Sequence, residues 1–178
     1  VIREGTTVGP TCKVGGEIEE SIIWGFSNKQ HDGFLGHAVL GSWINIAADS
    51  INSDLKNTYG PIRVPINGVE VDSGRMFVGL TMGDHSKSSI NSSFATGTVV
   101  GFCSNVLCNA FPPKFVPSFC WMTDAERRPY DPRRGLSVAK TVMARRKVTM
   151  SAAEEDLFLA IAEQCRQIEA ATLDGGRE

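Results

Sequence analysis

The sequence predicts a mainly β fold: a left-handed parallel β-helix of hexapeptide repeats, with a protruding loop or hairpin and C-terminal α-helices. The first observation behind this prediction is an apolar residue followed by glycine, recurring at intervals of about six, as in Val8-Gly9 and Val14-Gly15, then Leu35-Gly36 and Leu40-Gly41. That period matches neither a helix nor an alternating strand. It matches one side of a triangular coil. The left hand is that of the repeat class, an exception to the right-handed rule for parallel crossovers.

The second observation is an interruption of the rhythm between Asn52 and Gly74. Within it, the segment IRVPINGVEV alternates apolar and polar residues around Asn67-Gly68, a pair typical of a tight hairpin turn. We therefore expect an insertion over residues of about 52–76 that protrudes from the coil.

The rhythm returns at Val78-Gly79 and continues to Val106. The first and fifth residues of each six-residue block are predicted to point inward. The apolar residues that fit these positions are Ile90, Phe94, Val100, Phe102 and Val106. Two polar residues, Asp84 and Thr96, break the pattern. The proline-rich segment from Phe111 to Pro117 is expected to end the coil, because proline cannot donate to a strand ladder.

The third observation is a helical pattern near the C-terminus. Asp131-Pro132 resembles an N-cap followed by proline at the first helical position, which predicts a helix to about Arg146. Ser151 and Glu154 form a capping box for a second helix. Its apolar seam, suited to docking on the coil or on another subunit, is Phe158, Ile161, Cys165, Ile168 and Thr172. The predicted division is a β-helix domain over 1–122 and a helical extension over 123–178.

The charge, the apolar runs and the cysteines of the sequence bear on which partners and which cellular compartment are expected. The net charge of −2 gives no general reason to expect nucleic acid or membrane as a partner. No apolar run reaches the roughly 18 residues of a membrane span, and the first residues lack the apolar region of a signal peptide. Five cysteines without a CxxC pair favour buried thiols in a reducing cytoplasm. Because the chain begins without methionine and in mid-rhythm, we expect it to be part of a longer protein.

His31 is the leading candidate for chemistry, because a neutral imidazole is a good general base and the surrounding SNKQHDG buries nothing apolar. The alternative is a turn histidine bonded to the backbone. His37 lies six residues on, one side further round the coil, and His85 follows the insertion. A three-histidine zinc site, as in a hydratase, is a weak alternative, so no metal is predicted.

Further polar residues fall near this histidine or in the later coils. Asn45 and Asn52 can be sugar contacts or a structural ladder, whereas Asp54 and Lys56 suit an amine and a phosphate. Tight turns near Lys87 and at Thr96-Gly97 can present amides to a carbonyl or a pyrophosphate. Residues 127–147 hold eight basic side chains, read as a solvated helix face or a contact for phosphate or coenzyme A.

The segments NKQHDGFLGHAVLG, INIAADSINSDLKNTYG, FVGLTMGDHSKSSINSSFATGTVVG and FPPKFVPSFCW together resemble an alternative branch of the GlmU-like family of bifunctional sugar-phosphate nucleotidyltransferases and acetyltransferases. The resemblance covers residues of about 1–150 and concerns the C-terminal half of that family. It implies a trimeric left-handed β-helix that transfers acetyl from acetyl-CoA to an amino-sugar phosphate such as glucosamine-1-phosphate. It also implies an N-terminal nucleotidyltransferase domain in the parent protein.

The resemblance assigns roles to individual residues. His31 matches the general base of the family motif HLTYLG, and Phe34 stands at a substrate-binding tyrosine. Asn45 matches a sugar contact in the motif NIGAGT, in which Ala47 and Asp49 here replace two glycines. The family's asparagine that contacts acetyl-CoA falls on Asp54, or on Asn52 if the alignment slips by two residues.

Two functional hypotheses follow. In the first, the chain is an acetyl-CoA-dependent N-acetyltransferase of nucleotide-sugar biosynthesis, cytoplasmic and homotrimeric. His31 is then the base, Asn45, Lys56 and Lys87 position the substrate, and amides near Thr96 and Gly97 hold the thioester oxygen. Lys114 or the basic helix lies near the phosphates of the coenzyme. In the second hypothesis, motivated by Phe34, Ala47 and Asp49, this β-helix is a non-catalytic trimerisation or regulatory module.

Overall fold

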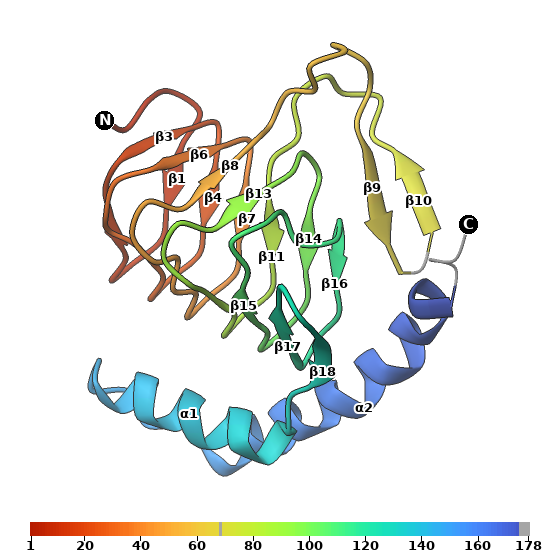
Figure 1. Ribbon diagram of the computed structural model, residues 1–178. Helices are drawn as coiled ribbons and strands as arrows, with labels where there is room; N and C mark the ends of the chain where they lie inside the picture. Colours follow the sequence, from red (N-terminus) through yellow and green to blue (C-terminus); the bar gives the residue numbers. More distant parts are fainter. Residues whose placement is uncertain (68, 175–178) are drawn as a thin grey trace.

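The chain winds into a coil of short parallel strands followed by two helices, which confirms the predicted parallel β-helix with C-terminal helices (Figure 1). The computed structural model describes residues 1–67 and 69–174. Short strands and single bridges from successive coils stack into three walls. Each coil therefore depends on its neighbours, and none can fold alone. The first wall is a six-stranded sheet: β1 (Thr7–Val8), β4 (Ile22–Ile23), β7 (Val39–Leu40), β11 (Thr81–Met82), β14 (Val99–Val100) and β16 (Phe115–Val116).

The other two walls are shorter ladders. The second wall consists of β2 (Lys13–Val14), β5 (Asn28–Lys29), β12 (Lys87–Ser88), β15 (Asn105–Leu107) and β17 (Cys120–Thr123), with β5 and β12 joined through single bridges to Asn45. The third wall consists of β3 (Glu17–Glu19), β6 (Phe34–Gly36), β8 (Ile51–Asn52) and β13 (Ser93–Phe94). The chain therefore visits the first, second and third walls in turn, and a corner separates each pair of walls.

The interior of the coil follows the six-residue period. From β3 onward, the strands of the three walls place a buried residue inward, such as Leu40 in the first wall, Val106 in the second and Phe94 in the third. β1 and β2 have no buried residue. The prediction of an inward side chain is wrong for two residues. Ile90 is 62% exposed, and Phe102 packs outside the coil against the helices. Both occupy the first position of a block, which the structure places at a corner and not inside.

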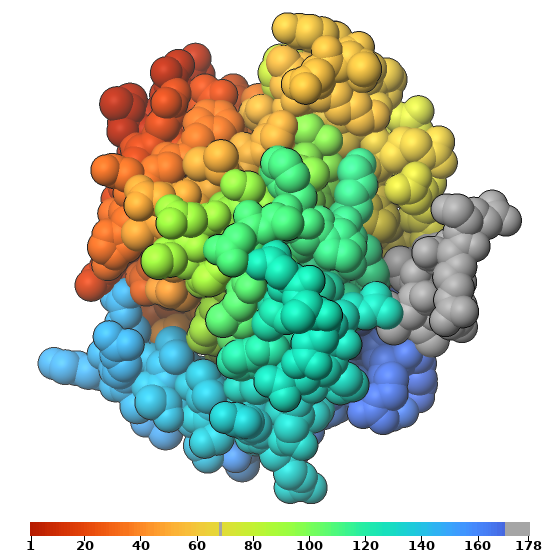
Figure 2. Space-filling model, viewed as in Figure 1, coloured from red at the N-terminus to blue at the C-terminus, as the bar shows by residue number. Residues whose placement is uncertain are grey.

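The insertion forms the predicted hairpin, with β9 (Arg63–Ile66) antiparallel to β10 (Val69–Asp72). Ile66 pairs with Val69, so the turn falls where Asn67-Gly68 was predicted, although Gly68 itself lies outside the described residues. The loop that leads to β9 forms the top of the view, and the hairpin lies at the right beside the later coils (Figure 1 and Figure 2). The insertion leaves the coil after β8 and rejoins it before β11, at the corner between the third and first walls.

The coil extends beyond the proline-rich segment that was predicted to end it. Phe115 and Val116 pair with β14, and β17 then pairs with β15, so the prolines lie inside the last coil. The prolines precede these short strands and leave the paired amides free to donate. The outer edge of β17 is covered by β18 (Arg127–Pro129), which pairs with it in the antiparallel direction and protects the edge against further strand addition.

Two helices cover the corner between the first and second walls. α1 (Pro132–Ala144) begins as predicted, with the Asp131 side chain accepting from the amide of Arg134. α2 (Ala152–Asp174) has the predicted capping box, in which Ser151 and Glu154 exchange hydrogen bonds. Of the predicted seam, Phe158 is buried and Ile168 is 42% exposed, while the side chain of Thr172 lies outside the described part. No helix in the described ranges is long and apolar enough to cross a bilayer.

An aromatic column anchors these helices. Phe26, Trp43 and His85 follow one another at this corner, each with a positive φ and stacked rings. Phe158 of α2 contacts His85 and Phe102 edge-on. A left-handed conformation costs a non-glycine residue about 1–2 kcal/mol, and the aromatic contacts with α2 offset that cost. This corner therefore serves to hold α2 against the coil.

Candidate functional site

His31 lies on an exposed turn at the corner between the second and third walls, directly after β5 and before β6. Its Nε2 is 2.8 Å from Nε2 of the Gln30 side-chain amide. The imidazole is thus exposed and within hydrogen-bonding distance of a neighbouring polar side chain.

A buried lysine supports this turn from inside the coil. Lys29 occupies an inward position of β5, is 0% exposed, and donates from Nζ to the carbonyl oxygens of His31 and Asp32. Burial lowers the pKa of Lys29, while the carboxylates of Asp32 and Asp49 raise it. The sequence analysis missed this residue. The signal was a lysine at an inward position of the six-residue repeat, where the other coils mostly have apolar or small residues.

Asn45 and Lys87 lie on the second wall beside the His31 corner. Asn45 is exposed and pairs through backbone bridges with both Asn28 and Lys87 in the flanking coils. Its Oδ1 accepts from the Asn28 side chain at 3.4 Å. Lys87 Nζ donates to the carbonyl of His85 at 2.7 Å, and burial lowers the pKa of Lys87. The predicted base and these two substrate residues therefore share one face of the coil.

Phe34 and Asn52 belong to the third wall and point in opposite directions. Phe34 is half-buried on the outer side. Asn52 points inward, is 2% exposed, and its amide group donates to the Gly36 carbonyl and accepts from the Gly36 amide, at 2.9 and 3.0 Å. The structure thus uses Asn52 to join two coils and leaves it no access to a substrate.

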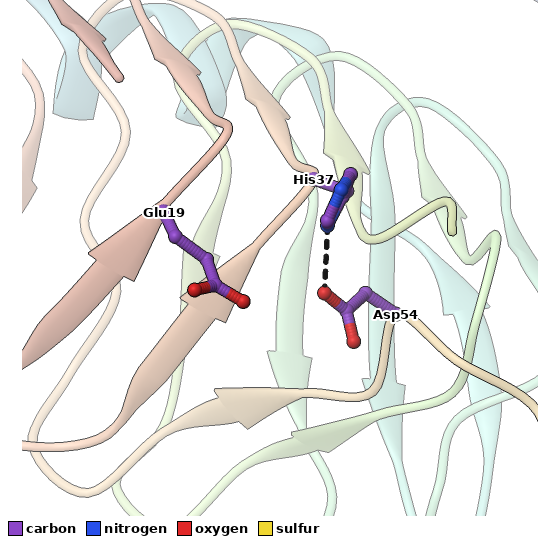
Figure 3. A group of neighbouring side chains, drawn as sticks. All are labelled: Glu19, His37 and Asp54. Atoms are coloured by element: carbon purple, nitrogen blue, oxygen red, sulfur yellow. Dashed lines mark hydrogen bonds and ion pairs between the residues drawn. The ribbon is translucent and has the colours of Figure 1, made fainter. Parts of the chain in front are cut away.

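The corner between the third and first walls gathers a second polar group, shown in Figure 3. Glu19, His37 and Asp54 come from three successive coils, and one potential ligand atom from each lies within 4.8 Å of the others. His37 Nδ1 is 2.8 Å from Asp54 Oδ2. The three side chains point toward one another and are all half-buried. Their spacings of 18 and 17 residues correspond to one coil each, which is the sequence signal that could have identified them.

Lys56 lies in the first part of the insertion, and Lys114 and the Thr96-Gly97 turn lie next to the insertion. Lys56 Nζ donates to the carbonyl of Pro61, and Lys114 Nζ donates to that of Arg63 at 2.8 Å. Burial lowers the pKa of Lys114, with Glu70 raising it and Lys56 lowering it further.

The predicted oxyanion amides lie at the same place. Thr96 is 8% exposed, and the Gly97 amide donates to the carbonyl of Val78 at 3.0 Å. That amide is therefore engaged within the fold and is not directed at a ligand. The insertion also leaves little room here, because a Cβ on Gly97 would come within 2.8 Å of Ile62.

The three histidines lie at three different corners. His31 follows a strand of the second wall, His37 one of the third and His85 one of the first. Within one chain they therefore cannot converge on a single metal ion. His85 is also buried among aromatic rings, which lowers its pKa to about 4, with Lys87 adding to the effect.

A cavity of about 380 Å³ lies between the end of the coil, β18 and α2. Arg127, Arg128 and Arg166 line it, together with Glu169, whose carboxylate accepts from the amide and hydroxyl of Ser118. None of the predicted site residues lines it. Two residues of the basic stretch over 127–147, Arg127 and Arg128, belong to β18 and not to a helix. Another residue of the stretch, Arg146, donates to the side-chain oxygen of Asn28.

Known proteins confirm the resemblance. The bifunctional protein GlmU of Methanococcus vannielii is 31% identical over 126 residues, which are 70% of this chain and 29% of that protein. GlmU of Methanocaldococcus jannaschii is 32% identical over 57% of this chain and 24% of its own length. The bifunctional sugar-1-phosphate nucleotidylyltransferase/acetyltransferase of Sulfurisphaera tokodaii is 26% identical over 56% of this chain and 25% of its own length. No family model matches the chain.

The chain spans about a quarter to a third of the length of these curated relatives. The matched stretch of 126 residues in the first of them approaches the length of the coil with its insertion. The similarity therefore concerns one part of a larger bifunctional protein.

Proposed function

We propose, from the resemblance to GlmU-like proteins, that this chain is an acetyl-CoA-dependent N-acetyltransferase acting on an amino-sugar phosphate in nucleotide-sugar biosynthesis. The observation that carries the proposal is the His31 turn, in which an exposed imidazole is displayed on a rigid coil and braced by the buried Lys29. The name of the Sulfurisphaera tokodaii relative supplies the reaction class, since it joins acetyl transfer to nucleotidyl transfer.

In the proposed reaction, the amine nitrogen of the acceptor attacks the thioester carbonyl of acetyl-CoA. A C–N bond forms, the C–S bond breaks, and coenzyme A leaves as the thiolate. His31 Nε2 takes the amine proton, so the substrate N–H replaces the Gln30 side-chain amide as the neighbour of Nε2. Asn45 and Lys87 lie on the adjoining wall and are proposed to bind the sugar and its phosphate.

The coenzyme is proposed to lie along the coil toward the insertion. Lys56 and Lys114 are the basic side chains there, and each now bonds a backbone carbonyl that a phosphate would replace. Because the Gly97 amide is engaged with Val78, the stabilising donor for the thioester oxygen would come from another group, including one on a neighbouring copy.

A homotrimer is part of the proposal. The outer side of the first wall carries apolar residues that are far from buried, such as Ile22 and Val39 at 45% and 42% exposure, with Trp24 nearby at 61%. Contiguous exposed apolar surface on a flat wall is suited to contact with another copy. We also propose a cytoplasmic location and an N-terminal nucleotidyltransferase domain in the parent protein, in keeping with the relatives' names and length.

The test is release of coenzyme A from acetyl-CoA in the presence of glucosamine-1-phosphate. The parent chain is expected to be active, and His31→Ala to reduce the rate about 10²–10⁴-fold, the usual contribution of a general base. Lys13→Ala, an exposed residue of the same second wall, is the matched control and is expected to change the rate less than about twofold. No activity in the parent, or equal rates for His31→Ala and the parent, would refute the proposal.

The second candidate is a non-catalytic trimerisation or regulatory module. The engaged Gly97 amide and the inward Asn52 favour it, because two predicted site residues are committed to the fold. Calorimetry separates the two functions. A folded trimer that gives no heat with millimolar acetyl-CoA would support the module, whereas saturable binding supports the enzyme.

A further inference from the structure

We propose that Glu19, His37 and Asp54 form a binding site for a divalent transition metal ion of the zinc type. These three side chains are shown in Figure 3 and lie at the corner between the third and first walls. His31 lies at the other end of the third wall. The metal-site proposal does not rest on the acetyl-transfer chemistry proposed above, although the resemblance places a coenzyme contact on Asp54.

The donor atoms match such an ion in kind and number. An imidazole nitrogen and two carboxylate oxygens lie within 4.8 Å of one another. Imidazole and carboxylate ligands together suit zinc and its neighbours better than magnesium or calcium, which prefer oxygen alone. Three protein ligands leave at least one coordination position for water or another small ligand.

Glycine at position 36 makes the approach of these groups possible. Glu19 pairs directly with Gly36 across the third wall, and Asp54 reaches Gly36 from the following coil. A Cβ on Gly36 would come within 2.4 Å of Asp54 Oδ2. The missing side chain therefore leaves a hollow on the outer face of the coil, and the carboxylate of Asp54 lies in it.

The histidine is held in place before any ion binds. Its backbone has a φ of 48° and bonds to both flanking coils, donating to the Glu19 carbonyl at 3.2 Å and accepting from Gly79 at 2.8 Å. The ring stacks on Phe77 at a centroid distance of 5.0 Å. His37 Nδ1 therefore points at the carboxylates, the orientation needed for a ligand nitrogen.

The charge of the site also favours a cation. Arg3 is 3.8 Å from Glu19 but pairs more closely with Glu17, at 2.6 Å. Among the described residues, the ion-pair partner of Asp54 is His37 alone. Two carboxylates held this close by the stacking of coils repel each other, and a divalent ion between them removes that repulsion.

The experiment is titration of the chain, freed of metal, with Zn²⁺ by calorimetry and with Co²⁺ by visible absorption. One ion per chain is expected, with the weak d–d bands of nitrogen and oxygen ligands. The five free thiols are the competing ligands, so a thiolate-to-cobalt charge-transfer band would overturn the proposal. Failure of the parent chain to bind either ion at millimolar concentration would also overturn it.

Variants then assign the ligands. His37→Asn keeps a residue that tolerates positive φ, and Glu19→Gln keeps the shape of the side chain. Because even outer residues of a metal site contribute about 10–100-fold to affinity, loss of a ligand is expected to weaken binding more than about 100-fold. His31→Ala, the matched control at the opposite corner, is expected to bind as the parent does. Parent-like affinity in both ligand variants, with folding verified by circular dichroism, would refute the site.

Discussion

The two ends of the third wall carry histidines in opposite surroundings. His31 is exposed, neighbours the Gln30 amide, and is braced by the buried Lys29. His37 is half-buried beside two carboxylates and is fixed by an aromatic ring. The two residues are six apart in the sequence, and a single strand, β6, separates them. One wall of a β-helix can thus present a free base at one corner and a ligand set at the other.

The difference arises from what lies above and below each residue in the stack. Residues about one coil away in the sequence decide the environment of a side chain, more than its immediate sequence neighbours do. Glu19 and Asp54 make the His37 corner acidic, whereas the carbonyl groups of the His31 turn are bonded to an ammonium group beneath it.

The third histidine, His85, lies at the remaining corner and is buried. Its protonation at low pH is expected to have the largest effect on stability. Burial lowers its pKa to about 4 from 6.5, so the unfolded chain binds the proton more readily. The free energy of unfolding is therefore expected to fall by up to about 3 kcal/mol as the pH is lowered from 6.5 to 4, at about 1.4 kcal/mol per unit of pKa. Urea unfolding at a series of pH values measures this.

Substitution isolates the contribution of that corner. His85→Phe keeps an aromatic ring in the stack and is expected to flatten the stability profile between pH 4 and 6.5. His31→Ala, which removes an exposed histidine, is expected to leave the slope unchanged. Parallel profiles for His85→Phe and the parent would contradict the assignment.

Lys29 tests what holds the His31 corner rigid. Lys29→Met preserves the length of the side chain and removes the hydrogen bonds to the His31 and Asp32 carbonyls. We expect a loss of about 2 kcal/mol in the free energy of unfolding. Amide hydrogen exchange over 31–33 is expected to become faster, while exchange at the His37 corner stays the same. Unchanged exchange at the His31 turn would show that Lys29 does not brace it.

Gly36 tests the opposite corner. Gly36→Ala places a Cβ where the Asp54 carboxylate and the Phe34 ring now lie, at 2.4 and 2.5 Å. We expect a loss of about 1–2 kcal/mol from crowding. Gly60→Ala is the matched control, because only the Thr58 hydroxyl, at 4.0 Å, lies near that position. Thermal unfolding compares the two variants, and equal melting temperatures would argue against a tight packing of Asp54 over Gly36.

Asp54→Asn gives the smallest effect on stability. The amide oxygen of the new asparagine can still accept a hydrogen bond from His37, and the ion pair is partly exposed. We therefore expect the free energy of unfolding to fall by less than about 1 kcal/mol. Metal affinity is expected to fall more than about 100-fold in the same variant. A large loss of stability with unchanged metal binding would mean that the His37 corner is structural.

The periodic parts of the fold could be predicted from the sequence. A six-residue rhythm, the Asn67-Gly68 turn and the two helix caps each act locally, so each predicted its element. The end of the coil could not be predicted from Pro112, Pro113 and Pro117. A proline blocks only its own amide, and the strands between and after them still pair.

The candidate site could be predicted only in part. His31 and Asn45 follow from a motif that is continuous in the sequence, and the structure places them beside one wall. The group of Glu19, His37 and Asp54 is discontinuous and depends on coil lengths of 17 and 18 residues, which small changes at the corners alter. Of the two alternatives for Asn52, the structure has the structural one, and the sequence could not decide because an asparagine inside a β-helix and one outside it have the same local sequence.

Rescue of His31→Ala by free imidazole is the most direct test of the proposed role of His31. A general base that has been deleted can be replaced by a small base in solution, whereas a structural histidine cannot. The account predicts that acetyl transfer to glucosamine-1-phosphate by His31→Ala rises with imidazole concentration, while the rate of the parent does not. A variant that folds and binds acetyl-CoA but shows no response to imidazole would contradict it.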